Sequence, residues 1–240
     1  TVLSQVDDLS VTIASIGDLT NLENLLKSKA DDISPLSGVE LVSKTVKRIV
    51  IMGGKYPSSY TWPLPEWNFG GVGLAKCDDS GYKCPSASAN YTIGHIPDTV
   101  ELIFTGYEVG KRITSGAKMS TCLAESNPCR QAYIDREGFN NSRFSWDPSA
   151  ILDAVLGIPE DLYQLVGHGG RNEIDIKTGN NQWINSSTEP GGVVAAVKIK
   201  TPNERYLYLK NQAAGESIGE MIDELLCKPR NSTHLGTSEV

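Results

Sequence analysis

An acid, an indole and an amide stand next to one another at Glu66, Trp67 and Asn68, in a stretch otherwise rich in Pro, Gly, Ser and aromatic residues. A carboxylate and an amide can bind hydroxyl groups, and an aromatic ring can cover the apolar face of a sugar. The tripeptide therefore matches a site for a polyhydroxylated ring. Buried polar groups are normally paired for structural reasons, so the same residues also fit a plain loop network around a half-buried Trp.

A second candidate carboxylate, Asp147, stands at the start of an apolar pattern with helical spacing that runs from 147 to 156. Pro148 is typical of the first turn of a helix, which places Asp147 at the positive end of the helix dipole. Spacing alone favours this structural role for Asp147. The three histidines, His95, His168 and His234, have no nucleophile motif nearby, and we interpret them as surface or loop residues.

Alternating strands and helices precede and follow these candidate residues. The strand candidates are 10–16, 48–52 and 100–105, and the helix candidates are 19–28, 38–45 and 147–156. The uninterrupted apolar run at 48–52 is typical of a parallel strand buried on both faces. Ligand sites of open α/β sheets lie beyond the carboxyl ends of such strands, where the long irregular segment 55–85 begins.

The pattern of the carboxyl-terminal third of the chain predicts a small antiparallel annex beside that parallel core. Short strand patterns separated by Gly and Asn turns occur at 162–166, 172–177, 193–200 and 206–209. An amphipathic helix at 217–226 follows, and a polar tail begins at about 228. The alternation of strands and helices predicts the α/β fold class, with an open, mainly parallel sheet flanked by helices and the annex beside it. Because the sequence has no repeat or linker, we expect a single domain over 1–240.

Charge and hydropathy exclude several classes of partner. The chain has 240 residues, a formal net charge of −7 and a pI of about 5.0. This balance offers no broad cationic surface for nucleic acid or for an anionic membrane. No apolar run approaches the roughly 18 to 20 residues that cross a bilayer, so no membrane span is expected.

The cysteines and glycosylation motifs favour an oxidising, secretory route, and we expect a secreted glycoprotein. Cys77 and Cys84 bracket one short loop and Cys122 and Cys129 another, which predicts two local disulfides, because the spacings do not fit a zinc site. Cys227 is left for an intermolecular bridge, a bridge to a missing segment or a buried thiol. The Asn-x-Ser/Thr motifs are at Asn90, Asn140, Asn185 and Asn231.

Five collinear segments resemble the inosine-uridine nucleoside hydrolase family. They are VTIASIGDLTNL (11–22), VKRIVIMGG (46–54), EWN (66–68), FTGYEVG (104–110) and SWDPSAILDAVLG (145–157). The resemblance implies the nucleoside-hydrolase fold and a calcium-dependent N-glycosidase that cleaves the bond between base and ribose of a nucleoside. By position it implies the Thr20 carbonyl and the Asp147 carboxylate as calcium ligands. It also implies a nucleoside pocket lined by Met52, Glu66, Trp67 and Asn68.

The chain departs from this family in the acidic residues. The Asp-rich motif DTDxxxDD, which supplies most calcium carboxylates and the water-activating Asp, does not occur in these residues, and Asp7-Asp8 is not a substitute. Trp146 stands where many members have a His, and Tyr60 stands about where a ribose-binding Asn is expected. Because Ca²⁺ usually takes about 6 to 8 oxygen ligands, we expect poor calcium binding and no catalysis by this chain alone, and we assign no catalytic residue within it.

Three hypotheses about function follow. The chain is an amino-terminally incomplete nucleoside hydrolase that is completed by an amino-terminal chain, or it is a non-catalytic extracellular binding or assembly glycoprotein, for example a homo-oligomer, on the same scaffold. A third hypothesis, which rests on aromatic content alone, is a sugar-binding module that uses Trp62, Trp67 and Trp183.

Overall fold

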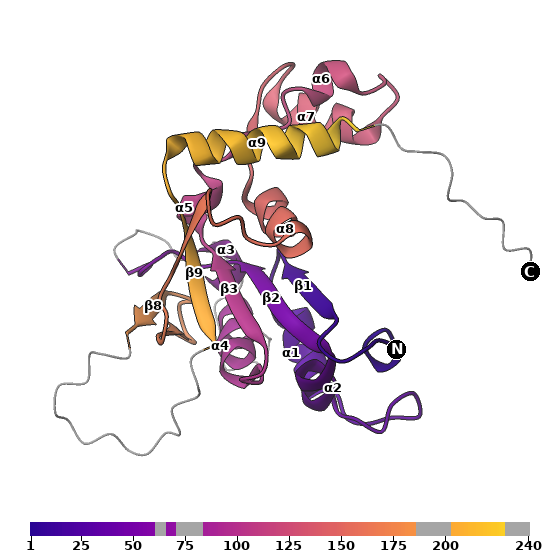
Figure 1. Ribbon diagram of the computed structural model, residues 1–240, viewed down its shortest axis with the longest axis vertical. Coiled ribbons are helices and arrows are strands. Elements are labelled where there is room, and N and C mark those ends of the chain that lie inside the picture. Colours follow the sequence, from indigo (N-terminus) through magenta and orange to yellow (C-terminus); the bar gives the residue numbers. More distant parts are fainter. Residues whose placement is uncertain (61–65, 71–83, 186–202, 229–240) are drawn as a thin grey trace, which may run out of the picture.

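The computed structural model describes residues 1–60, 66–70, 84–185 and 203–228 (Figure 1). Its centre is a five-stranded sheet with the strand order β1-β2-β3-β9-β6. The strands are β1 (Val11–Ser15), β2 (Val46–Met52), β3 (Glu101–Thr105), β9 (Glu204–Leu209) and β6 (Tyr163–Val166). The first four are parallel to one another and β6 is antiparallel to β9, which confirms the predicted α/β class and its mainly parallel sheet.

Helices cover both faces of this sheet. They are α1 (Thr20–Lys27), α2 (Gly38–Thr45), α3 (Trp67–Gly70), α4 (Pro85–His95), α5 (Tyr107–Gly110), α6 (Met119–Cys122), α7 (Pro128–Glu137), α8 (Trp146–Leu156) and α9 (Gln212–Leu226), with a short 3₁₀ turn η1 at Leu3–Gln5. In Figure 1, α1, α2 and α4 lie toward one end of the view, whereas α9 crosses the other end with α6 and α7 beside it. No helix in the described part of the chain has the length and hydropathy to cross a membrane.

The apolar runs of β2 and β3 feed two separate cores, because successive side chains of a strand point to opposite faces. Ile51 and Phe104 belong to the cluster that packs against α1, α2 and α4. Val50 and Ile103 belong to the cluster that packs against α8 and α9. The central strands are therefore buried on both faces, as the uninterrupted apolar pattern predicts.

Strand β9 differs from its sequence-based prediction. The sequence pattern predicts 206–209 as part of the antiparallel annex, but β9 begins at Glu204 and inserts between β3 and β6, parallel to β3. Tyr206, Leu207 and Leu209 are buried, and they enter both cores. The annex consists instead of a hairpin, β7 (Arg171–Ile174) and β8 (Asn181–Ile184), and of a two-residue pairing of β4 (Thr114–Ser115) with β5 (Arg143–Phe144). The strand predicted at 193–200 lies outside the described residues.

The predicted disulfide between Cys122 and Cys129 is wrong. Cys122, at the end of α6, is bonded to Cys227, with a Cα–Cα separation of 5.6 Å. Helix α9 carries Cys227 to α6, whereas Cys129 is a free, exposed thiol in the first turn of α7. Asn127 caps that turn by accepting hydrogen bonds from the amides of Cys129 and Arg130, at 2.9 and 3.2 Å, so the start of α7 is fixed by capping and not by a bridge.

The other predicted disulfide, between Cys77 and Cys84, stays a prediction. Cys84 is disulfide-bonded in the structure, but Cys77 lies outside the described residues.

The asparagines at 90, 140 and 185 are all exposed, and the side chain of Asn90 is hydrogen-bonded to a neighbouring element. The Asn90 side chain, on α4, donates a 2.8 Å hydrogen bond to the Ile174 carbonyl, so a glycan there would break a helix–hairpin contact. Asn140 is exposed, with φ of 59° in the turn after α7, and Asn185 is exposed after β8. Asn231 lies outside the described residues.

We therefore predict that, in a eukaryotic secretory host, Asn140 carries a glycan and Asn90 does not. Intact-mass measurement should show that Asn140→Gln lacks the mass of one enzymatically removable glycan, whereas Asn90→Gln keeps all of the glycan mass of wild type. A glycan mapped to Asn90 by peptide mass spectrometry would contradict the prediction.

Candidate functional site

The carboxyl ends of β1, β2 and β3 form one edge of the sheet. Ser15 pairs with Ile51, and Met52 with Thr105, so the segments that follow the three strands begin side by side. The start of α8 reaches the same edge, since the Trp146 indole donates a 2.9 Å hydrogen bond to the Tyr107 carbonyl. This edge is where open α/β sheets place their ligand sites.

Glu66 is held at this edge by backbone amides. Its side chain is 4% exposed, and its Oε2 accepts hydrogen bonds from the amides of Gly54 (3.0 Å), Asn68 (3.0 Å) and Phe69 (3.3 Å). Burial raises the pKa of Glu66 to about 7, and the backbone donors act in the opposite direction. The carboxyl group is therefore fixed in orientation before any ligand arrives.

Asn68 is anchored to the end of β2. Its Nδ2 donates to the Met52 carbonyl at 2.9 Å and lies 3.1 Å from the Met52 Sδ. The structure thus brings Met52, Glu66 and Asn68 together, and their role in binding a nucleoside stays a prediction. Trp67, in the first turn of α3, is 64% exposed and presents its ring to solvent.

Two charged residues at this edge were missed from the sequence, Lys55 and Glu108. Lys55 is buried, and its Nζ lies 5.2 Å from the centroid of the Tyr107 ring. Burial lowers the pKa of Lys55, while the charges of Glu66 and Glu108 oppose that shift. Burial raises the pKa of Glu108 to about 7. Lys55 directly follows the glycine pair after β2, and Glu108 stands two residues after the glycine that follows β3; this position is the signal that could have identified them.

Aromatic rings line the part of the edge next to α8. Tyr107 and Trp146 are stacked, with ring centroids 5.5 Å apart and planes 25° apart. Phe144 meets Trp146 edge-on at 5.4 Å and is partly exposed. This cluster offers ring faces to a planar ligand, and the Lys111 ammonium lies 5.5 Å from the centroid of the Tyr107 ring.

The implied calcium ligands do not form a metal site by themselves. Asp147 is exposed in the first turn of α8, and its pKa is raised by partial desolvation and lowered by Arg143. Thr20 begins α1. Among the described residues, no three His, Cys, Asp or Glu side chains are grouped so that they could hold a metal ion. Since two oxygen donors do not fit the needs of Ca²⁺, we derive no step through calcium.

Two other residues singled out from the sequence lie in structural positions. The Tyr60 hydroxyl is directed to Asp175, which it reaches with a 3.4 Å hydrogen bond. Trp183 is 6% exposed and belongs to the core, which removes it from a surface site for sugars. Trp62 lies outside the described residues.

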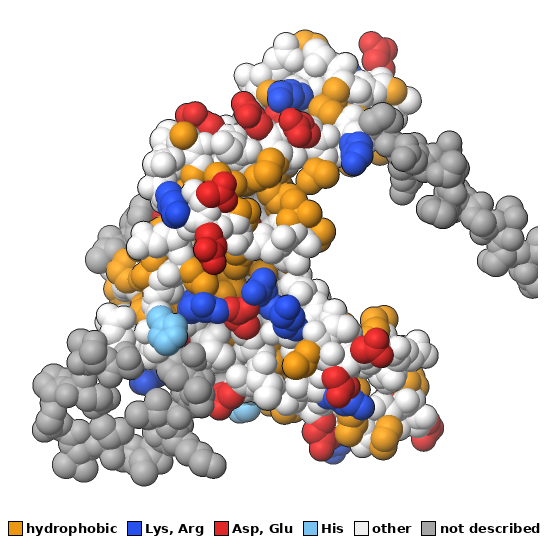
Figure 2. Space-filling view, viewed as in Figure 1, with side chains coloured by type: hydrophobic (Ala, Val, Ile, Leu, Met, Phe, Trp, Pro, Cys, Tyr) orange, Lys and Arg blue, Asp and Glu red, His pale blue; other side chains and the backbone are white. Residues whose placement is uncertain are grey.

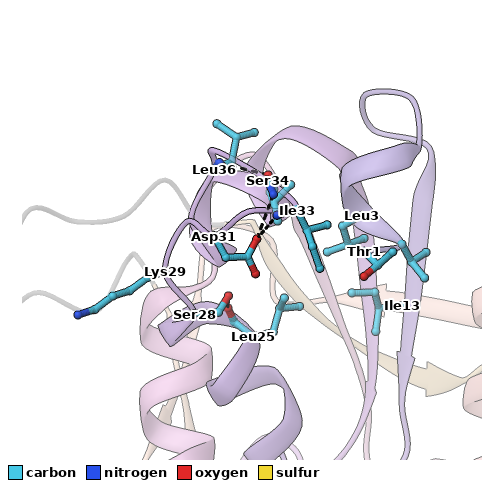
Figure 3. Close-up of a pocket in the computed structure, with 12 residues that line it drawn as sticks. Thr1, Leu3, Ile13, Leu25, Ser28, Lys29, Asp31, Ile33, Ser34 and Leu36 are labelled. Carbon is cyan, nitrogen blue, oxygen red and sulfur yellow. Dashed lines mark hydrogen bonds between the residues drawn. The ribbon is translucent and has the colours of Figure 1, made fainter.

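A hollow of about 340 Å³ lies elsewhere, between η1, β1, the end of α1 and the loop that follows it (Figure 3). Its walls are mainly apolar and include Leu3, Ile13 and Leu25. The Asp31 carboxylate accepts hydrogen bonds from the amides of Ile33 and Ser34, at 2.9 and 3.0 Å, and so holds its own loop. Helix α1 runs away from the carboxyl edge, so this hollow is separate from the Glu66 site.

Comparison with known proteins shows a similarity in fold. No protein-family model and no curated protein matches the chain. Among solved structures, a plant nucleoside hydrolase, the PpNRh1 enzyme, is similar, with a TM-score of 0.57 and 15% sequence identity over 92% of this chain and 63% of that chain. The chain thus spans less than two thirds of the length of that enzyme. At this identity, the similarity shows a nucleoside-hydrolase-like fold.

Proposed function

We propose that this chain forms the sugar- and base-binding part of a nucleoside N-glycosidase, which hydrolyses the bond between ribose and base. The observation that carries the proposal is the position of Glu66 and Asn68, which hydrogen bonds hold just beyond the end of β2. It occurs in a fold similar to that of a plant nucleoside hydrolase. The plant enzyme's name supplies the reaction class, and the geometry supplies the groups that would bind such a substrate.

The residues of the chain have separable roles in this proposal. Glu66 accepts hydrogen bonds from ribose hydroxyls, and the amides that fix it spare the cost of reorienting it during binding. Asn68 is a second hydroxyl-binding group beside the end of β2. The Tyr107–Trp146 stack and the exposed Trp67 ring offer apolar faces for the base.

We further propose that a complementing polypeptide segment supplies the acidic residues that the described part lacks. The far edge of β1 has no strand partner among the described residues, and β1 is only half-buried. On the neighbouring helix α8, Ile151, Val155 and Leu156 are 43%, 74% and 65% exposed, and Figure 2 shows hydrophobic side chains over α8 on the wall of a broad hollow. Parallel sheets normally have both faces covered, so a strand and an apolar helix fit this surface.

In that completed assembly, Thr20 and Asp147 would contribute to a calcium site whose other ligands the complementing segment provides. The Cys122–Cys227 disulfide and the exposed motifs at Asn140 and Asn185 support the proposal that the chain is a secreted glycoprotein.

The test is release of free base from inosine or uridine, followed by chromatography, together with nucleoside binding followed by Trp fluorescence. We expect binding by wild type, and base release once an Asp-rich segment is co-expressed. Glu66→Gln and Asn68→Ala should each weaken binding by about 10- to 100-fold, the effect of losing a charge-assisted or buried hydrogen bond. Glu160→Gln, at an exposed site, is the control. Equal binding by wild type and both site variants would refute the proposal.

The second candidate function is a non-catalytic extracellular assembly or binding glycoprotein. The exposed apolar face of α8 favours it, because identical copies could bury that face against each other. A concentration-dependent oligomer that Ile151→Glu dissolves, together with no base release in the presence of any Asp-rich segment, would select this function.

A further inference from the structure

The buried amide of Asn181, in β8, makes the two hydrogen bonds to Lys55 that a neighbouring strand would make. Its Oδ1 accepts from the Lys55 amide and its Nδ2 donates to the Lys55 carbonyl, each at 2.9 Å. Asn181 is 0% exposed and is 126 residues from Lys55 in sequence. An Asn that satisfies both backbone groups of one residue fixes that peptide segment in position.

Behind Asn181, a chain of buried polar contacts leads to the hairpin and to β9. The Asn181 Nδ2 is 3.3 Å from the Asn172 Oδ1, and the Asn172 Nδ2 donates to the Tyr56 hydroxyl at 3.0 Å. The backbone amide of Asn172 donates to the Glu204 Oε2 at 2.7 Å. The hairpin β7–β8 is thereby tied to the sheet on one side and to the Lys55–Tyr56 segment on the other.

The same segment is held from the opposite side by the candidate site. The Tyr56 amide donates to the Glu108 Oε2 at 3.3 Å, and the Gly54 amide donates to Glu66. Gly54 has a φ of 80°, and a Cβ on it would stand 2.8 Å from the Phe69 ring, so this position of the turn requires glycine. Three consecutive residues, 54 to 56, are each held by a different side chain.

We propose that Asn181 and Glu108 are positioning residues of the candidate pocket. They hold the peptide groups of Lys55 and Tyr56 and thereby keep the Gly54 amide on the Glu66 carboxylate. Neither residue is hydrogen-bonded to Glu66, whose partners are backbone amides, and both act through the 54–56 turn. A role of these residues in nucleoside binding rests on the proposed function, whereas the coupling through the turn does not.

Amide hydrogen exchange measured by NMR tests the coupling. Asn181→Asp keeps the shape of the side chain but replaces the donor to the Lys55 carbonyl by an oxygen. Glu108→Ala removes the acceptor for the Tyr56 amide without touching the hairpin. We expect amide exchange at Gly54 to accelerate at least tenfold in both variants. The same acceleration is expected at the Tyr56 amide in Asn181→Asp and at the Lys55 amide in Glu108→Ala. Each of these amides keeps its own hydrogen-bond acceptor in the variant named, so it can respond only through the turn.

The controls separate positioning from general loss of stability. Amides of Val50 and Ile51, in β2, should keep their protection, and Gln182→Ala, an exposed neighbour of Asn181, should leave the turn unchanged. Unchanged exchange at Gly54, or an equal loss of protection throughout β2, overturns the inference. Nucleoside affinity is then measured with the same variants, and tenfold weaker binding by Asn181→Asp is expected. If wild type binds no nucleoside, the proposed function fails while the exchange result still decides the coupling.

Discussion

Replacing Asp153 by Asn is expected to stabilise the protein by roughly 3 to 4 kcal/mol at pH 8 and by little at pH 4.5. Asp153 lies on the inner face of α8, 1% exposed, and neither of its carboxylate oxygens has a well-formed hydrogen bond among the described residues. Burial raises the pKa of Asp153 to about 7, and the nearby Tyr163 hydroxyl offsets part of that shift. Helix α8 thus places a buried carboxyl group, without a charged partner, against one of the two cores of the sheet.

The direction of the pH dependence follows from the two states. In the unfolded chain Asp153 ionises near its ordinary pKa of about 3.9, whereas in the folded protein it keeps its proton to about pH 7. Between these values the folded state holds one more proton, so stability is full below about pH 4 and falls until about pH 7. An Asn cannot ionise, so the variant is free of this loss. Glu66 and Glu108 are unchanged in both proteins, and the difference between the proteins isolates Asp153.

Urea unfolding of wild type and Asp153→Asn from pH 4.5 to 8 measures this difference. The exposed Asp161→Asn is the matched control and should follow wild type throughout. A free-energy difference between Asp153→Asn and wild type that stays constant with pH would show that Asp153 ionises in the folded protein as it does in water.

Loss of the Cys122–Cys227 disulfide is expected to cost about 3 to 5 kcal/mol of unfolding free energy. The bridge joins residues 105 positions apart, so it removes a large loop entropy from the unfolded chain. It also fixes the end of α9 to α6. The double variant Cys122→Ser/Cys227→Ser leaves no new free thiol at either position, which avoids exchange with the bridge at Cys84.

The control for this prediction is Cys129→Ser, because the Cys129 thiol is exposed and free. It should unfold at the wild-type urea concentration under non-reducing conditions. If the double variant matched wild type, or if Cys129→Ser lost as much stability as the double variant, the assignment of this bridge would be wrong.

Local patterns predicted the parallel core, and they did so where one physical effect dominates. The apolar run at 48–52 lies in β2, and the helix expected at 38–45 begins with a Ser37–Glu40 capping box. Helices α4 and α7 were not predicted, because neither has a clear apolar face in the sequence. Helix α4 buries mostly small side chains such as Ser88 and Ala89, which gives little amphipathic signal, and α7 buries none of its residues.

Contacts between distant residues could not be predicted from one sequence. The tripeptide at 66–68 was identified because its chemistry is local, and its seat on Gly54 and Met52 follows from the end of β2. Asn181 gave no signal, since its role exists only once a hairpin more than 120 residues away folds against Lys55. The bridge from Cys122 to Cys227 was missed for the same reason, because short spacing favoured the local pairing.

The place of β9 between β3 and β6 also governs how the protein can be made. The strand that occupies this gap is the last strand of the described chain, so a ribosome must translate to about residue 209 before the sheet can close. Until then, a nascent chain exposes the hydrogen-bonding edges of β3 and β6, which invites mispairing with other nascent chains. Premature termination before Glu204 would therefore yield a product with a split sheet, a substrate for chaperones and proteases rather than a smaller version of the fold.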